Sequence, residues 1–312
     1  MPNTIRIGTR GSELALWQTY HVKALLEAFF PGIAIDVQKV NTTGDKILDT
    51  PLAKIGDKGL FTKELEIALL DDRVDIAVHS FKDVPTLIPE GLTIAAVLER
   101  EDVRDVFIAN PKKSHRTFTD IPPNSIIATG SLRRKFQLLN AHPDIQIVEI
   151  RGNLNTRIKK LDSSEWDGMI LAKAGITRLG WAQRMTDILP IDLMLPAVGQ
   201  GALAIECRTG NQHVQEMLRP LHHHTTAAAV TAERALLRYL EGGCQIPIGA
   251  YGRSIKNEFQ LDAVIGSLDG KRIVRGKKIG TIADAEKIGI DLAKELFNQG
   301  GREILKEIRQ PS

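Results

Sequence analysis

The chain has 312 residues, an ordinary balance of apolar and charged residues, and a formal net charge of only +3. This length predicts two or three domains, and the small charge excludes a polycation that binds nucleic acid through its overall charge. No apolar run is long enough to span a bilayer, and two cysteines make no disulfide framework. We therefore expect a cytoplasmic protein without membrane or nucleic-acid partners.

The first hundred residues alternate between strand-like and helix-like patterns. Strands are predicted at 5–8, 33–40, 76–78 and 92–98, and helices from Ser12 and over 61–70. Trp17 is expected in the core of this unit. Residues 41–60 show no clear period and contain Lys54 and Lys58. A loop of this length inside a compact domain indicates a lid or a disordered tether.

The charged junction at 99–104 predicts a crossing into a second α/β unit, and residues 195–201 predict the return. Strands are expected at 106–109, 126–128, 145–150, 169–172 and 203–207, with helices from Leu132 and Leu154. Cys207 lies on the apolar face of its strand, so we expect it to be a small core residue.

His222-His223-His224 opens a third section. A helix over 226–240 is followed by strands near 248–253, 259–265 and 272–277, and then by two closing helices. The predicted domains are residues 1–99 with 200–218, residues 104–195, and residues 222–312. The first two are α/β lobes, and the third is an α+β domain with a three-stranded antiparallel sheet.

The strand at 76–78 leads into the adjacent opposite charges Lys82 and Asp83, and Pro85 stops it. Functional sites in open α/β sheets form where strands end. Lys82 and Asp83 are therefore candidate site residues. The alternative is that Asp83 only shapes the turn before Pro85.

Three predicted strand ends share a glycine, a Ser or Asn helix cap, and nearby arginines. They are Arg10-Gly11-Ser12, Thr129-Gly130-Ser131-Leu132-Arg133-Arg134, and Arg151-Gly152-Asn153 with Arg157. Arginines in a first helical turn oppose the helix dipole unless an anion neutralises them. Arg also suits bidentate recognition of carboxylates. Together the three ends predict a site for phosphate or several carboxylates, to which Lys54, Lys58, Lys82 and Arg178 would add. The alternative for each arginine is solvation or pairing with an acid elsewhere.

Cys244 lies between Gly243 and Gln245, just past a predicted helix end. This setting suits a thiolate nucleophile or an attachment point, and the alternative is a buried, inert thiol. The histidines at 222–224 have no further ligands at metal spacing, so a hinge and no metal is expected. Gly199-Gln200-Gly201 lacks the other residues of a phosphate loop.

Taken in order, these motifs resemble the porphobilinogen deaminase (hydroxymethylbilane synthase) family over almost the whole chain. The motifs are Thr9-Arg10-Gly11-Ser12, Gly44-Asp45 with residues 52–61, Val78 to Pro85, Ser131 to Arg134, Arg151-Gly152-Asn153, Leu195 to Cys207, and Gly242-Gly243-Cys244-Gln245. One departure is Ala128-Thr129-Gly130-Ser131, where the family has Gly-Thr-Ser-Ser. We expect it to tune binding.

The resemblance implies two lobes like those of periplasmic binding proteins, with the site in the cleft between them, and a third domain. It implies a monomeric transferase of tetrapyrrole (haem) biosynthesis. Such an enzyme joins four porphobilinogen molecules head to tail with loss of ammonia, and then releases linear hydroxymethylbilane by hydrolysis. It also implies one dipyrromethane cofactor per chain, linked through a thioether to Cys244.

The resemblance further implies roles for the candidate residues. Asp83 is the catalytic carboxylate, which stabilises a methylene-pyrrole cation and moves protons. The residues expected to contact the cofactor, besides Cys244, are Lys82, Asp83, Thr129, Ser131, Arg133, Arg134, Gly199 and Gln200. Those expected to bind the substrate are Arg10, Ser12, Lys58, Arg151, Arg157 and Arg178.

Two rival functions remain open at this point. A two-lobed anion receptor shares the arginines but leaves an accessible Cys244 unexplained. A cysteine hydrolase, with Cys244 as nucleophile and His79 or one of residues 222–224 as base, explains the thiol but not the arginines.

Overall fold

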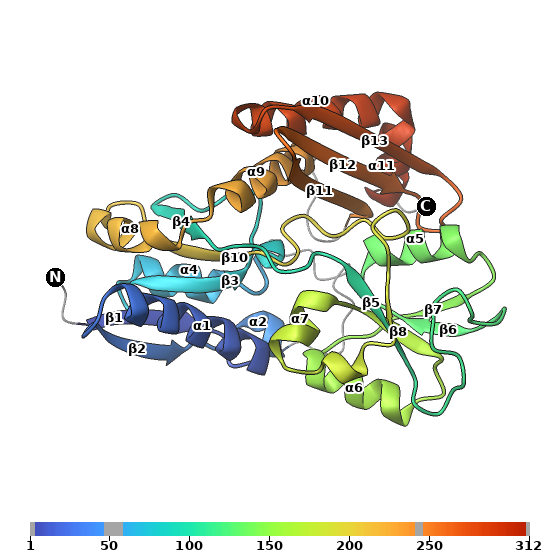
Figure 1. Cartoon of the computed structure of the whole chain (residues 1–312), viewed down its shortest axis with the longest axis horizontal. Coiled ribbons are helices and arrows are strands. Elements are labelled where there is room, and N and C mark those ends of the chain that lie inside the picture. Colours follow the sequence, from blue (N-terminus) through green and yellow to red (C-terminus); the bar gives the residue numbers. More distant parts are fainter. Residues whose placement is uncertain (1–3, 47–58, 241–245, 310–312) are drawn as a thin grey trace.

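The computed structural model describes residues 4–46, 59–240 and 246–309. In this part of the chain it contains three β-sheets (Figure 1). Two are five-stranded and belong to α/β lobes, and the third is three-stranded and antiparallel. The predicted fold class is therefore confirmed. The predictions for Lys54, Lys58 and Cys244 lie outside the described residues.

The first sheet has the order β2-β1-β3-β10-β4. Its strands are β2 (Ala34–Lys39), β1 (Thr4–Thr9), β3 (Ile76–Ser80), β10 (Leu203–Arg208) and β4 (Leu92–Val97). β1 pairs in parallel with β2 and β3, whereas β10 is antiparallel to β3 and β4. The helices of this lobe are α1 (Glu13–Phe29), α2 (Thr43–Lys46), α4 (Lys63–Leu70) and α8 (Gln212–Leu218).

Alternate residues of β3 face opposite sides of this sheet, as the strand pleat requires. Ile76 and Val78 pack with apolar residues of α1 and α8, whereas Ala77 packs with α4. Both faces are thus covered, and Cys207 is fully buried as predicted. Trp17 differs from the prediction, because it is 37% exposed and stacks on His21 at the surface of α1.

The second sheet repeats the same arrangement in the order β7-β6-β8-β5-β9. Its strands are β7 (Gln146–Val148), β6 (Ile126–Ala128), β8 (Gly168–Ala172), β5 (Asp105–Ala109) and β9 (Asp187–Ile188). β6 is parallel to β7 and β8, and β5 is antiparallel to β8 and β9. Its helices are α5 (Leu132–Ala141), α6 (Leu154–Ser163) and α7 (Lys173–Arg178).

The chain passes between the two lobes twice. It leaves the first sheet after β4 and enters the second at β5, and it returns from β9 to β10. In each sheet the strand that the chain enters after a crossing, β5 or β10, is the one that runs antiparallel to its neighbours. These crossings coincide with the predicted junctions at 99–104 and 195–201, while the exact domain limits stay a prediction.

The third sheet consists of β11, β12 and β13, packed against three helices (Figure 1). The strands are β11 (Ile248–Ile255), β12 (Glu258–Gly266) and β13 (Ile273–Gly280), and the helices are α9 (His224–Tyr239), α10 (Ala285–Leu296) and α11 (Arg302–Arg309). Short 3-10 turns lie at Phe81–Asp83, Ala182–Arg184, Arg219–Leu221 and Ile282–Asp284, and a π-turn at Phe297–Gly301.

The histidine run joins the first lobe to α9. The His223 backbone N–H donates to the Val97 carbonyl at 2.7 Å, and its ring nitrogen accepts from the Thr226 N–H as the N-cap of α9. Within the described ranges, no three His, Cys, Asp or Glu side chains are grouped to hold a metal ion. No helix among these elements has the length and apolar character needed to cross a bilayer.

Candidate active site

Asp83 lies on a single 3-10 turn, Phe81–Asp83, that directly follows the buried strand β3. The Val84 N–H donates to the Phe81 carbonyl at 3.2 Å and closes the turn. Phe81 and Val84 are buried in an apolar cluster with Val230 of α9. Because these two side chains anchor the turn, Lys82 and Asp83 between them stay partly exposed.

Arg234 of α9 holds the same turn from the third domain. Its guanidinium donates to the Val84 carbonyl at 3.0 Å and to the Pro85 carbonyl at 2.5 Å. It also lies 4.8 Å from the centre of the Phe81 ring. Arg234 is only 8% exposed, so its contacts to the Asp83 turn are shielded from water.

The return crossing packs directly against the Asp83 turn through Gly199. This residue has φ of +71°, and a Cβ there would lie 3.1 Å from the Lys82 backbone nitrogen. Only glycine permits this approach without strain. The Gly199 N–H donates to Glu233 Oε2 at 2.7 Å, and the same buried carboxylate accepts from both terminal nitrogens of Arg100 at 2.6 and 3.1 Å.

A small pocket opens beside Asp83 in the first lobe. Residues that line it include Arg10, Ser12, Phe61, His79, Ser80 and Asp83. The Arg10 guanidinium lies 4.2 Å from the centre of the Phe61 ring, and Ser12 caps α1 by accepting from the Ala15 N–H at 3.3 Å. The structure therefore brings Arg10 and Ser12 to the pocket of Asp83.

Arg133 and Arg134 are buried at the start of α5 and meet one carboxylate, Asp105 of β5. Arg133 Nη1 lies 2.8 Å from Asp105 Oδ2, and Arg134 Nη2 lies 2.8 Å from Asp105 Oδ1. The sequence predicted that an anion must neutralise these arginines, and the protein supplies one itself. The Nε atoms of both arginines are buried without a hydrogen-bond partner among the described residues.

Gln200 completes this buried network. Its amide donates to Asp105 Oδ1 at 3.0 Å and to the Val103 carbonyl at 2.7 Å, and its oxygen accepts from Arg133 Nη2 at 3.4 Å. Burial alone would raise the pKa of Asp105, but the charges and hydrogen bonds of the two arginines outweigh it and lower the pKa to about 2. The carboxylate is therefore ionised at neutral pH.

Two further cations, Arg157 of the second lobe and Lys82 of the first, lie within the electrostatic field of Asp83. Burial and the charge of Arg134 lower the pKa of Arg157 to about 10, while Asp83 opposes that change. Burial also lowers the pKa of Lys82, and Asp83 again opposes it. Arg157 Nε donates to the Gly152 carbonyl at 2.8 Å. Arg151 has a buried Nη1 with no hydrogen-bond partner in the part of the chain that is described.

Arg178 takes a different position, at the junction of the lobes. Its Nη2 donates to the Gly201 carbonyl at 2.7 Å, and its guanidinium lies 5.8 Å from the centre of the Trp17 ring. Burial lowers its pKa to about 10, against the opposing charge of Glu101. These contacts connect α7 with α1 and the return crossing, and they explain why Trp17 is not in the core.

The departure from the family motif has a structural counterpart. Ser131 caps α5 by accepting from the Arg134 N–H at 3.4 Å, and Thr129 Oγ1 accepts from the Ser131 N–H at 3.3 Å. A Cβ on Gly130 would lie 2.7 Å from the Ile150 carbonyl oxygen. A serine at this position would therefore displace the backbone that leads into Arg151.

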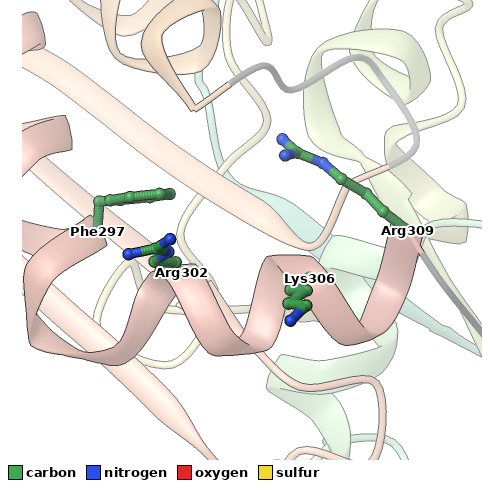
Figure 2. A pocket seen from close by; sticks show the side chains of 4 residues that line it. All are labelled: Phe297, Arg302, Lys306 and Arg309. Atoms are coloured by element: carbon green, nitrogen blue, oxygen red, sulfur yellow. The ribbon is translucent and has the colours of Figure 1, made fainter.

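A separate pocket lies on the third domain, next to α11. Figure 2 shows Phe297, Arg302, Lys306 and Arg309 around it. Arg309 Nη2 donates to the Leu240 carbonyl at 2.6 Å, which ties α11 to the end of α9. The residues predicted from the sequence to form the site do not line this pocket.

Sequence reasoning missed Asp105, Glu233 and Arg234. Asp105 could have been sought as the counter-ion that Arg133 and Arg134 require, although nothing in the pattern indicated which acid it was. Glu233 and Arg234 are charged residues on the buried face of α9. Charged residues on an otherwise apolar helix face indicate buried polar partners, but only the fold shows which groups these are.

Similar solved structures include the periplasmic aliphatic sulphonate binding protein SsuA from Escherichia coli, with 16% identity and a TM-score of 0.42, covering 77% of this chain and 71% of that one. The BvgS periplasmic VFT2 domain of Bordetella pertussis has 13% identity and a TM-score of 0.41, covering 69% and 85%. The L-cystine solute receptor of Neisseria gonorrhoeae has 11% identity and a TM-score of 0.39, covering 78% and 94%.

Two family models match the chain in succession. One is "Porphobilinogen deaminase, dipyromethane cofactor binding domain", over residues 5–216, and the other is "Porphobilinogen deaminase, C-terminal domain", over residues 227–298. The first covers both lobes, with the Asp83 turn, the arginines and the crossings, and the second covers most of the third domain. The chain belongs to the porphobilinogen deaminase family.

Proposed function

We propose that this protein condenses four porphobilinogen molecules, with loss of ammonia at each step, and releases linear hydroxymethylbilane by hydrolysis. The observation that carries the proposal is one carboxylate, Asp83, on a fixed turn among cations from both lobes. Arg10 shares its pocket, and Lys82 and Arg157 lie within its electrostatic field. Membership of the family supports the same function.

The described residues fit a dipyrromethane cofactor, which we propose to be linked, one per chain, through a thioether to Cys244. Two linked pyrroles, each with an acetate and a propionate, need several donors in a dry site. Arg151 Nη1 and the Nε atoms of Arg133 and Arg134 are buried donors without partners in the described part. When bound, this group supplies the pyrrole carbon to which the first substrate is joined.

Asp83 would stabilise the methylene-pyrrole cation that porphobilinogen forms when ammonia leaves. A preorganised charge near such a cation needs little reorganisation during the reaction, and removal of one such group lowers kcat by a factor of about 10²–10³. The turn is fixed by Arg234 from one side and by Gly199 from the other. Asp83 would also accept the proton that the attacking pyrrole carbon loses.

The remaining cations would bind the acetates and propionates of substrate and product. We assign this role to Arg10, Ser12, Arg151, Arg157, Arg178 and Lys58. We assign cofactor contacts to Lys82, Asp83, Thr129, Ser131, Arg133, Arg134, Gly199 and Gln200, where Gly199 acts by placing the Lys82 turn. We further propose that the enzyme is a cytoplasmic monomer, that residues 41–60 act as a lid, and that it has no nucleic-acid or membrane partner.

Intact mass spectrometry of the purified protein tests this function, before and after addition of porphobilinogen. The expected result is an adduct of two pyrrole units on the Cys244 peptide, which grows by single pyrrole units with substrate. Cys244→Ser should carry no adduct. Cys207→Ser is the matched control and should keep it, because Cys207 is buried and burial raises the pKa of its thiol to about 11.

The same experiment separates the rival functions. An unmodified Cys244 in a protein that binds porphobilinogen without turnover would favour the anion receptor. An unmodified Cys244 whose loss abolishes a hydrolytic activity would favour the cysteine hydrolase. Either result after incubation with substrate would overturn the proposed deaminase function.

A further inference from the structure

A buried acid–histidine pair lies behind the pocket of Asp83. Glu206 of β10 is fully buried and His79 of β3 is 4% exposed. The antiparallel register pairs Glu206 with Ala77, so His79, two residues further along β3, faces the same side of the sheet. His79 Nε2 lies 3.0 Å from Glu206 Oε2.

A second buried acid reaches the same side of the sheet from α4. Glu66 is 8% exposed, and α4 covers the face of β3 to which Ala77 belongs. Burial raises the pKa of Glu66, and the charge of Glu206 raises it further, against the opposing effects of Thr62 and His79. The titratable groups that act on Glu66 are thus His79 from β3, Glu206 from β10 and Glu64 from α4 itself.

Two carboxylate oxygens of this group lack a hydrogen-bond partner in the ranges that the structure describes. They are Glu66 Oε1 and Glu206 Oε1, each shielded from solvent. Ionised carboxylates only accept hydrogen bonds, so two buried carboxylates cannot satisfy each other while both are charged. One proton on the pair would remove a charge and supply a donor, as in other pairs of interacting acids.

This group is connected to the site of the reaction. His79 and Thr62 belong to it and also line the pocket that contains Asp83. His79 lines this pocket and also contacts Glu206, so it lies between the two. Because a histidine ring can bind a proton at one nitrogen and release one from the other, His79 can pass a proton from the pocket to Glu206.

We propose that Glu66 and Glu206 hold one shared proton at neutral pH, and that through His79 this pair receives the proton released in each condensation. The second part rests on the proposed function. When the carbon–carbon bond forms, the C–H bond of the attacking pyrrole breaks, and its electron pair restores the aromatic ring. The proton passes to Asp83, then to one nitrogen of His79, while the other nitrogen of His79 protonates Glu206.

Protons are neither gained nor lost by the protein over one cycle of condensation. The pair starts with one proton and a charge of minus one, and it ends with two protons and no charge, while His79 gains one proton and loses one. The ammonia that leaves is a base and takes up one proton by the reverse route. The pair is thereby restored, and no other reactant is required.

Infrared spectroscopy tests the shared proton without any activity assay. The wild-type protein at neutral pH should show the C=O band of a protonated carboxyl group, and this band should shift in D2O. Glu66→Gln, which keeps the shape of the protonated acid, should lack the band. Glu90→Gln changes an exposed acid of the same lobe and should keep it.

Absence of the band from the wild type, or its survival in Glu66→Gln, would overturn the proposal. A cation held between two ionised carboxylates would give the first of these results. If Glu206→Gln does not fold, this comparison remains available, because it needs only Glu66→Gln and Glu90→Gln.

Steady-state kinetics test the transfer itself. Glu206→Gln should lower kcat at least tenfold, change KM less than twofold, and alter the pH profile of kcat, because the acceptor is lost while the substrate-binding cations remain. A kcat equal to that of the wild type across the pH range would overturn the transfer. If the wild type itself forms no hydroxymethylbilane, the proposed function fails, whereas the infrared result still decides the shared proton.

Discussion

Arg234 is predicted to be a positioning residue for Asp83, although it belongs to the third domain. It donates to the carbonyls of Val84 and Pro85 at 3.0 and 2.5 Å and lies over the Phe81 ring. The informative substitution is Arg234→Met, which keeps an unbranched apolar stem and removes the charge and both hydrogen bonds. The Val84 carbonyl, which is buried, and the Pro85 carbonyl, which is partly buried, then lose their donor.

The size of the effect follows from these contacts. A hydrogen bond from a charged donor contributes about 1.5–3 kcal/mol, and a shielded cation–π contact contributes up to about 2 kcal/mol. Relaxation of the turn recovers part of this sum, so we expect Arg234→Met to lower the free energy of unfolding by about 3 kcal/mol. A displacement of Asp83 by about 1 Å should lower kcat about 10²-fold.

The assay compares kcat, KM, the Cys244 adduct and thermal unfolding in three variants. Arg238→Met is the matched control, because Arg238 lies one turn further on the same helix in an exposed ion pair with Glu286, a contact worth about 0–1 kcal/mol. Arg234→Lys should recover part of kcat. If Arg234→Met unfolds more easily but keeps the wild-type kcat well below its melting temperature, Arg234 is only a structural residue and the positioning argument is refuted.

Three further substitutions test the network around the turn. Because the fold lowers the pKa of Asp105 from 3.8 to about 2, the ionised carboxylate should stabilise the protein by about 2 kcal/mol above pH 3.8, and this contribution should be lost as the pH falls towards 2. Urea unfolding should show this loss in the wild type but not in Asp105→Asn. At neutral pH the variant should be about 3–5 kcal/mol less stable than the wild type. Gly199 has φ +71° and lies close to Lys82, so Gly199→Ala should lower the free energy of unfolding by about 1–3 kcal/mol and should also lower kcat. Gly210 has open space around it, so Gly210→Ala should change neither the stability nor kcat. Gly130→Ser should raise KM for porphobilinogen, because its Cβ would lie 2.7 Å from the Ile150 oxygen; an unchanged KM would show that the backbone adjusts without moving Arg151.

The sequence was sufficient to predict the helices and strands that local patterns determine. Period-two apolar runs located the long strands, and small polar residues after glycine located the caps Ser12 and Ser131. The same patterns missed α7, α8 and β9, which are six, seven and two residues long. Segments this short carry too few periodic positions to be distinguished from a loop.

The partners of the predicted charges could not be read from the sequence. Asp105 lies 29 residues from Arg134, and Arg234 lies 150 residues from Val84, and local spacing says nothing about pairs this distant. A helix-terminal arginine pair predicts an anion but cannot tell a ligand from a buried aspartate. Trp17 fits the helical period of core residues, but the second lobe presents Arg178 to its ring and leaves it at the surface.

Helix α9 explains how a third domain can bear on the chemistry proposed at Asp83. Glu233 accepts from Arg100 of the first crossing and from Gly199 of the second, and the next residue, Arg234, holds the Asp83 turn. The helix then continues to Tyr239, about 8 Å beyond Arg234 at 1.5 Å per residue, and leads into the chain segment that contains Cys244. One rigid element thus connects the proposed catalytic carboxylate, both crossings and the start of the cysteine segment. A shift of α9 relative to Asp83 would have to break a buried ion pair and the two hydrogen bonds from Arg234. We therefore expect the carboxylate and the end of this helix to move as a unit during the proposed reaction.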